Sequence, residues 1–376
     1  MKKYLLFFFL ICLAGYLPAQ TGVETKPTFT VVKLNAATPV KNQAATGTCW
    51  SFSTTSLVES QALKSNAGEI DLSEMFTVRN IYIEKAKNYV MRLGRAQFGE
   101  GGLGHDQIHA IATYGAMPES AYSGLTGGQK SHNHSKLFTA LKTYLDNLIK
   151  TTPLAENWIA GYIDILDAAL GKAPAEFEYK GKTYTPKTFA QEVLKFDAND
   201  YVALTSFTHH PFYEPFILET MDNFSNGSFY NLPLYELIQL TKDALNSGYT
   251  LMWDADVSNK GFNQKMGMAV YVEDNDKANI QDIVSGVSEE GAVNPVIRQQ
   301  LFENLTTQDD HLMHIIGLET DKKGESFFVV KNSWGEVGPD KGYINVSEPY
   351  FAINTISLVV PKAAISKSLL EKLKIK

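Results

Sequence analysis

Hydrophobic residues recur with a helical period in the first third of the chain. Residues 49–65 place apolar side chains on one face, which predicts a helix that begins at Cys49. Residues 69–93 show a second helical pattern. The glycine-rich stretch 99–118 then predicts a loop followed by a short helix.

The middle and the last third of the chain differ in their patterns. Residues 130–175, 186–196 and 233–248 again favour helices, and residues 175–186 predict a hairpin around a Lys-Gly turn. From residue 249 onward, runs such as "TLMWDADV", "HLMHIIGLE" and "SFFVVKNSW" are typical of strands. The sequence therefore predicts an α+β protein in which a helix-rich part precedes a strand-rich part.

The N-terminus has the pattern of an export signal. Lys2 and Lys3 precede an apolar run over residues 4–16, and Ala19 offers a cleavage site. This run is too short to span a bilayer, so a membrane anchor fits less well. A lipoprotein signal at Cys12 also fits less well, because a bulky residue precedes it. We therefore expect a signal peptide over residues 1–19 and a periplasmic or secreted mature protein, with no membrane attachment after cleavage.

Charge and cysteine content narrow the choice of partner. Removal of Lys2 and Lys3 leaves 32 of the 34 basic residues against 41 acidic ones, a net charge of −9. This balance argues against nucleic acid and anionic membranes as partners. Loss of Cys12 leaves Cys49 as the single cysteine, so no internal disulfide can form. Cys49 is then either a buried apolar residue or a chemical reagent.

A nucleophilic thiol needs several neighbours, and the sequence offers some of them. A helix N-terminus lowers the pKa of a cysteine, and Cys49 lies at the predicted start of a helix. The thiol also needs a histidine, and that histidine needs an acceptor that fixes its ring. The developing oxyanion needs donors, for which the backbone N–H of Cys49 and a nearby amide are suited. Gln43 lies six residues upstream of Cys49.

Two distant segments resemble one enzyme family. "PVKNQAATGTCWSFS" resembles the nucleophile segment of papain-like cysteine peptidases. "DHLMHIIGLETDKKGESFFVVKNSWGEVGPDKGYINVS" resembles the histidine strand of that family and its Asn-Ser-Trp-Gly block. The glycine loop, "MWDADVSNKGFNQKMG" and the long insertion between the motifs resemble the bleomycin hydrolase and aminopeptidase C branch. Two motifs in the family's order are far more specific than either motif alone.

The resemblance implies a role for individual residues. Cys49 is the expected nucleophile, Gln43 the oxyanion donor and Asn332 the acceptor that orients the histidine ring. Two histidines, His311 and His314, are candidates, and in a strand they face opposite sides. The family has a small residue six positions after its histidine, and a glycine stands there only for His311. We therefore expect His311 to act and His314 to be a packed strand residue.

Supporting roles also follow from the resemblance. Trp334 would cover the hydrogen bond between histidine and asparagine, with Trp50 beside the nucleophile, although both could be ordinary core residues. Gly101 and Gly102 would expose their backbone to an extended substrate, since side chains there would block its approach. A flexible loop is the alternative interpretation of this glycine pair.

The sequence predicts no metal and no organic cofactor. His209-His210 and the pair His132 and His134 could be ligands, but neither group has the paired spacing of a metal site.

The resemblance implies a papain-like two-lobed fold and a domain order. We expect a nucleophile lobe over residues 20–120, a helical insertion over 121–248, a β-rich lobe with the histidine and asparagine over 249–362, and a C-terminal tail over 363–376. In the branch, the C-terminal carboxylate lies in the cleft, holds the amine of the peptide substrate and thus makes an aminopeptidase, and six subunits form a ring. The ending "KLKIK" departs from the small residues of that branch. An exported endopeptidase, a peptide-binding protein and an acyltransferase or deamidase remain alternatives.

Overall fold

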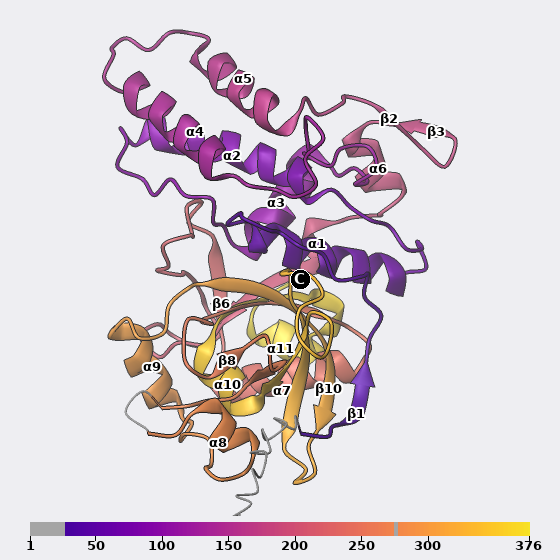
Figure 1. Ribbon diagram of the computed structural model, residues 1–376, viewed down its shortest axis with the longest axis vertical. Helices are drawn as coiled ribbons and strands as arrows, with labels where there is room; N and C mark the ends of the chain where they lie inside the picture. Colours follow the sequence, from indigo (N-terminus) through magenta and orange to yellow (C-terminus); the bar gives the residue numbers. More distant parts are fainter. Residues whose placement is uncertain (1–26, 274–276) are drawn as a thin grey trace, which may run out of the picture.

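The computed structural model describes residues 27–273 and 277–376. The predicted signal peptide, residues 1–19, lies outside the described residues. Two lobes follow one another along the long axis of the molecule, one of helices and one built on a sheet (Figure 1). The helices of the first lobe are α1 (Cys49–Lys64), α2 (Glu74–Met91), α3 (Gly104–Tyr114), α4 (Ser135–Leu148), α5 (Trp158–Leu170) and α6 (Pro186–Glu192).

One large sheet forms the second lobe. Its described strands run in the order β5-β6-β4-β13-β7-β10-β11-β12-β9-β8, and β1 pairs with β10. These strands are β1 (Thr30–Leu34), β4 (Tyr201–Thr205), β5 (Pro215–Ile217), β6 (Ser228–Asn231), β7 (Leu251–Ala255), β8 (Phe262–Asn263), β9 (Met268–Ala269), β10 (His311–Thr320), β11 (Ser326–Lys331), β12 (Tyr343–Ser347) and β13 (Thr355–Pro361). The other helices are α7 (Leu234–Asn246), α8 (Ile280–Val284), α9 (Pro295–Glu303), α10 (Glu348–Asn354) and α11 (Lys367–Lys372), with 3₁₀ turns η1 (Ala198–Asp200) and η2 (Lys362–Ala364).

Helix α1 lies at the junction of the lobes. It packs against β10 on one side and against α2 and α3 on the other (Figure 1). Buried polar residues such as Ser51, Thr54 and Glu59 therefore accompany its apolar ones. The helix was predicted with one apolar face, but it is covered nearly all round because it belongs to the interface of both lobes. This burial fixes Cys49, its first residue, between them.

The long helical insertion predicted over residues 121–248 is shorter than expected. Strands β4, β5 and β6 belong to the large sheet, and α7 packs on the core of the β-rich lobe. These strands are only three to five residues long, too short for a distinct periodic signal. The helical pattern over residues 130–175 is also divided, into α4 and α5. The helical elaboration therefore ends near η1.

The predicted hairpin is confirmed. Strands β2 (Phe177–Tyr179) and β3 (Lys182–Tyr184) pair around Lys180 and Gly181, which both have positive φ, at 48° and 77°. Two consecutive positive φ values are what a tight two-residue hairpin turn requires, and glycine adopts them without strain.

The C-terminal tail forms a helix that docks on the sheet lobe. Ser366 caps α11 by accepting a hydrogen bond from the backbone N–H of Leu369. Leu369 and Leu373 are buried in the core of the β-rich lobe, so one face of this predicted amphipathic helix is packed. Among the helices of the described residues, none is both long and apolar enough to cross a membrane.

Candidate active site

Cys49 begins α1 and faces the first residues of β10. Its side chain is 8% exposed. The backbone N–H of Leu312, the residue after His311, donates a hydrogen bond to its sulfur. The structure therefore brings the two distant motifs together, with the nucleophile candidate on the helical lobe and the histidine candidate at the edge of the sheet lobe.

His311 and Asn332 form a direct hydrogen bond. Nε2 of His311 lies 2.7 Å from Oδ1 of Asn332. The Trp334 ring lies 4.6 Å from the His311 ring, centroid to centroid, at an interplanar angle of 31°. Burial lowers the pKa of His311, and the bond with Asn332 opposes this effect. The hydrogen bond thus holds the ring in one orientation, under an indole that limits access of water.

Gln264 is part of this site, and sequence reasoning missed it. Its Oε1 accepts a hydrogen bond of 2.7 Å from Nδ2 of Asn332. Oδ1 of Asn332 also accepts from the backbone N–H of Ser333 at 2.7 Å. These two bonds define which end of the amide faces His311. Gln264 lies within "GFNQKMG", but nothing in that motif indicates contact with a residue far along the chain.

Gln43 is hydrogen-bonded to Ser333, the residue after Asn332. Its Oε1 accepts a hydrogen bond of 2.6 Å from the Ser333 hydroxyl, and its backbone N–H donates to the Ser333 carbonyl at 2.8 Å. Its Nε2 donates to the carbonyl of Thr46 at 2.8 Å and keeps one further hydrogen. The amide therefore has a fixed orientation, with one N–H left for an oxyanion.

His314 lies on the opposite face of β10 from this site. Its Nδ1 lies 2.8 Å from the hydroxyl of Ser56 on α1, which also accepts a hydrogen bond from Lys331. Burial lowers the pKa of His314 well below its ordinary value, and the Lys331 ammonium adds to this effect. The structure thus gives His314 a structural hydrogen bond to Ser56, whereas Asn332 is hydrogen-bonded to His311.

The glycine loop lies directly against Trp50. The indole Nε1 donates to the carbonyl of Glu100 at 3.0 Å, and the Glu100 carboxylate accepts from the backbone N–H of Gly47 at 2.8 Å. A Cβ at residue 102 would lie 3.2 Å from the Trp50 ring. A larger residue at position 102 would therefore have to move the Trp50 ring, which is fully buried in the core.

Comparison with known proteins decides the family. The model of the Peptidase C1-like family matches residues 96–376, and that of papain family cysteine proteases matches residues 27–138. The chain belongs to the Peptidase C1-like family. This membership confirms the predicted cysteine peptidase and its α+β papain-like fold.

Named relatives of this Peptidase C1-like protein span most of its length. It is 25% identical to aminopeptidase G of Lactobacillus delbrueckii subsp. lactis, with 87% of this chain and 82% of the relative covered. It is 24% identical to the bleomycin hydrolase of Gallus gallus, over 88% of this chain and 82% of the relative. The crystal structure of PepW from Lactobacillus rhamnosis shares the fold, with a TM-score of 0.75 at 18% identity, and covers 94% of this chain and 86% of that one.

The electrostatics around Cys49 differ from the sequence prediction. Burial raises the pKa of its thiol to about 12, which the hydrogen bond from Leu312 opposes. Three carboxylates raise this pKa further, those of Asp309, Asp254 and Asp222. The predicted lowering of the thiol pKa is therefore wrong for the substrate-free peptidase, because burial, and after it the three carboxylates, outweigh the effect of the helix N-terminus.

Two of these carboxylates form a pair. Asp254 and Asp309 are hydrogen-bonded to each other, and Oδ2 of Asp254 also accepts from the Ser357 hydroxyl at 3.0 Å. Burial raises the pKa of both groups. The Asp309 carboxylate raises the pKa of Asp254 further, and the Asp222 carboxylate raises that of Asp309, whereas the bond with Asp254 opposes the shift of Asp309. Like charges this close cannot both ionise readily, so the pair shares one proton and retains negative charge.

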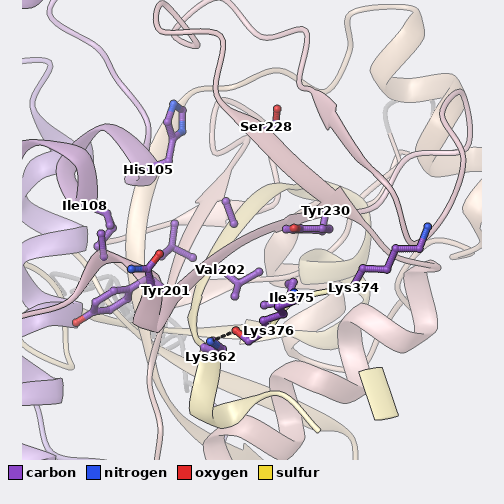
Figure 2. A pocket seen from close by; sticks show the side chains of 14 residues that line it. His105, Ile108, Tyr201, Val202, Ser228, Tyr230, Lys362, Lys374, Ile375 and Lys376 are labelled. Atoms are coloured by element: carbon purple, nitrogen blue, oxygen red, sulfur yellow. Dashed lines mark hydrogen bonds between the residues drawn. The ribbon is translucent and has the colours of Figure 1, made fainter. Parts of the chain in front are cut away.

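The end of the chain lies in a pocket of its own. Figure 2 shows Lys376 and Ile375 close to Lys362 and Val202, whereas His105 lies at the far end of the pocket. The ammonium of Lys362 donates to the backbone oxygen of Lys376. None of the described residues that line this pocket belongs to the site around Cys49. The position of the chain end thus departs from the arrangement that the bleomycin hydrolase resemblance implies.

One group of described side chains has metal-ligand composition, His209, His210 and Glu219. Nε2 of His210 lies 2.8 Å from Glu219, and Nε2 of His209 lies 3.2 Å from it. Gln299 accepts from the backbone N–H of Thr208 at 2.6 Å, so its amide nitrogen is the group that donates to Nδ1 of His209. The proton of His209 is then on Nε2, where it binds Glu219. This arrangement fastens Glu219 by hydrogen bonds.

Proposed function

We propose that this protein is a cysteine aminopeptidase in which Cys49 forms an acyl-enzyme and His311 transfers the protons. One observation carries the proposal. The His311–Asn332 hydrogen bond, covered by Trp334, lies at the strand end that binds Cys49 through Leu312. Nucleophile, base and orienting group are thereby in one place, as covalent catalysis requires.

The chemistry follows from these positions. The Cys49 sulfur attacks the carbonyl carbon of the peptide bond while His311 accepts the thiol proton. The backbone N–H of Cys49 and the free N–H of Gln43 stabilise the oxyanion. His311 then protonates the leaving amine, and the C–N bond breaks. Water, deprotonated by His311, hydrolyses the thioester and restores the thiol.

The choice of aminopeptidase rests on the relatives. Aminopeptidase G of Lactobacillus delbrueckii subsp. lactis and aminopeptidase C of Listeria innocua both match this chain over more than four fifths of its length. The listeria enzyme is 25% identical to the chain. These names support removal of N-terminal residues from peptides in preference to cleavage within them.

Export and assembly complete the proposal. The basic start and apolar run over residues 1–19 support a signal peptide, which sequencing of the mature N-terminus would test. A homo-hexamer is supported by the bleomycin hydrolase resemblance, and light scattering on the purified mature protein would measure it.

The activity test pairs a dipeptide amide that has a free amine with its N-acetylated form. We expect the mature protein to cleave only the free-amine compound, and Cys49→Ala to cleave neither. Cleavage of both compounds would make the protein an endopeptidase. Cleavage of neither would exclude simple peptides as substrates and favour the acyltransferase, deamidase or peptide-binding alternatives.

A further inference from the structure

The loop between β5 and β6, residues 218–227, connects the two lobes. Its strands form the edge of the sheet, yet Leu218 and Phe224 are buried in the core that the helices of the first lobe build. Asn223 closes the loop on itself. Its Nδ2 donates to the carbonyls of Leu218 at 2.9 Å and Gly227 at 3.0 Å, and its Oδ1 accepts from Gly227 at 2.7 Å. The β5–β6 loop is therefore an internally bonded arm.

The arm is also fastened to the cleft walls. The Ser225 hydroxyl donates to the buried Asp106 of α3 at 2.7 Å and lies 2.8 Å from Nε2 of His105. On the sheet side, the backbone N–H of Asp222 donates to the Asp309 carboxylate. Asp222 is thus held between the glycine loop and the start of β10.

The Asp222 carboxylate lies against Gly101. A Cβ at residue 101 would overlap that carboxylate, so any larger residue there would have to displace the Asp222 side chain. Gly101 is one of the two glycines whose backbone we expect to face an extended substrate. Asp222 occupies the space in front of it, and its charge acts on Cys49 as well. A carboxylate therefore stands where a longer peptide would continue away from the nucleophile.

This carboxylate has no cation of its own among the described residues. No lysine or arginine nitrogen of that part of the chain forms an ion pair with Asp222. Lys85 acts on it electrostatically, but the Lys85 ammonium donates to the carbonyls of Gly99 and Gly101. A half-buried carboxylate beside a nucleophile is well placed to accept hydrogen bonds from a cationic group of the substrate.

Lys376 is not placed to supply such a carboxylate. Strand β13 starts level with Ala255, which also pairs with His311, and then runs away from the site. Pro361, six residues after Thr355, is about 20 Å further along. The terminal residues then pack beside Lys362 (Figure 2).

We propose that Asp222 binds the free α-ammonium group of the substrate, and that the β5–β6 loop closes the cleft beyond that residue. This inference rests on the proposed aminopeptidase function and names the group that makes the enzyme an exopeptidase. The α-nitrogen of the first residue is attached to the carbon next to the scissile carbonyl. A carboxylate in front of Gly101 then both attracts the ammonium and excludes any residue before it.

The test compares two fluorogenic amides that differ only in the amine, alanyl and propionyl 7-amido-4-methylcoumarin. We expect the wild-type protein to prefer the alanyl compound. Asp222→Asn should lower the ratio of kcat/KM for the alanyl compound to kcat/KM for the propionyl compound by about 30-fold or more, mainly through KM of the alanyl compound. The exposed Asp243→Asn on α7 is the matched control and should behave as wild type.

The ratio of kcat/KM for the two substrates is independent of the fraction of folded protein, because the same active molecules cleave both. If Asp222→Asn retains the wild-type preference for the alanyl compound, the proposal is overturned while the aminopeptidase function stands. If the wild-type protein shows no such preference, the proposed function itself fails. Extension of the chain by two glycines after Lys376 moves the terminal carboxylate and should leave the preference unchanged. Loss of preference in this variant would assign the amine to the chain end instead.

Discussion

The two faces of β10 each hold a histidine, and the comparison shows what distinguishes a reactive site from a structural one. His311 and His314 are 4% and 0% exposed, so burial does not separate them. On one face His311 meets a neutral amide oxygen and an indole. On the other face His314 meets a hydroxyl that is itself bound to the ammonium of Lys331.

The partners determine what each ring can do. An amide oxygen accepts a hydrogen bond from either the neutral or the protonated ring, so His311 can gain a proton while it remains bound to Asn332. A nearby cation opposes protonation, so His314 stays neutral. The second face continues into a network, in which Lys331 binds Thr38 at 3.1 Å and Thr38 binds Glu59 at 2.5 Å. That network joins α1 to the sheet.

Separate substitution of the two histidines should give the largest difference in activity. We expect His311→Gln to lower kcat/KM by about 10⁴-fold or more, because the base of the reaction is lost. His314→Gln should keep activity within about threefold once corrected for folded protein, because the ring touches no reacting group. Steady-state kinetics with a free-amine substrate measures both variants. The reverse outcome would move the catalytic role to the other face.

The network on the structural face should matter for stability. Glu59→Ala removes the acceptor of Thr38, of Lys41 and of the backbone N–H of Leu72. We expect the free energy of unfolding to fall by about 3 kcal/mol, since buried donors and a cation lose their partner. Urea denaturation measures this change. The exposed Glu69→Ala serves as control and should remain within about 0.5 kcal/mol of wild type.

The orienting residues of the reactive face should have smaller effects on activity. Asn332→Ala should lower kcat/KM by about 10- to 100-fold, as removal of groups that orient a reactive side chain does. Gln264→Ala should lower it by less, since it acts only through Asn332. Kinetics of the single and double variants tests this order. Additive effects would contradict it, because residues in one chain of contacts do not act independently.

The smallest expected effect concerns pH. The pKa of His314 is lowered in the folded protein, so unfolding lets it bind a proton below the ordinary value of about 6.5. Its contribution to stability is complete above this pH and is lost as the pH falls toward the folded-state pKa. The free energy of unfolding of wild type minus that of His314→Gln should therefore decrease between about pH 7 and pH 5. A difference independent of pH would show that the ring protonates in place.

Local sequence patterns predicted the parts of this protein that depend on interactions between residues close together in the chain. Helices α1 to α3 and the Lys-Gly hairpin are such parts, since the residues of each lie close together in the chain. The motif resemblance added the pairing of Cys49 with His311.

The site residues that the sequence did not reveal contact partners far away along the chain. Gln264 reads as an ordinary loop amide, and Asp222 lies in a polar stretch with no motif. Only the folded chain brings them to Asn332 and Gly101. The paired carboxylates of Asp254 and Asp309 were missed for the same reason, because their contact depends on the register between β7 and β10.

The carboxylates around Cys49 also affect how fast oxidants react with its thiol. Peroxides attack the thiolate and not the thiol, so a cysteine kept protonated is oxidised slowly. Burial and the three carboxylates raise the pKa of the Cys49 thiol and thus disfavour the thiolate. In the proposed complex, the substrate ammonium at Asp222 would neutralise part of that negative charge and favour the thiolate when substrate is bound. Within the described residues, Cys49 is the only cysteine, and a raised thiol pKa would spare it damage between turnovers.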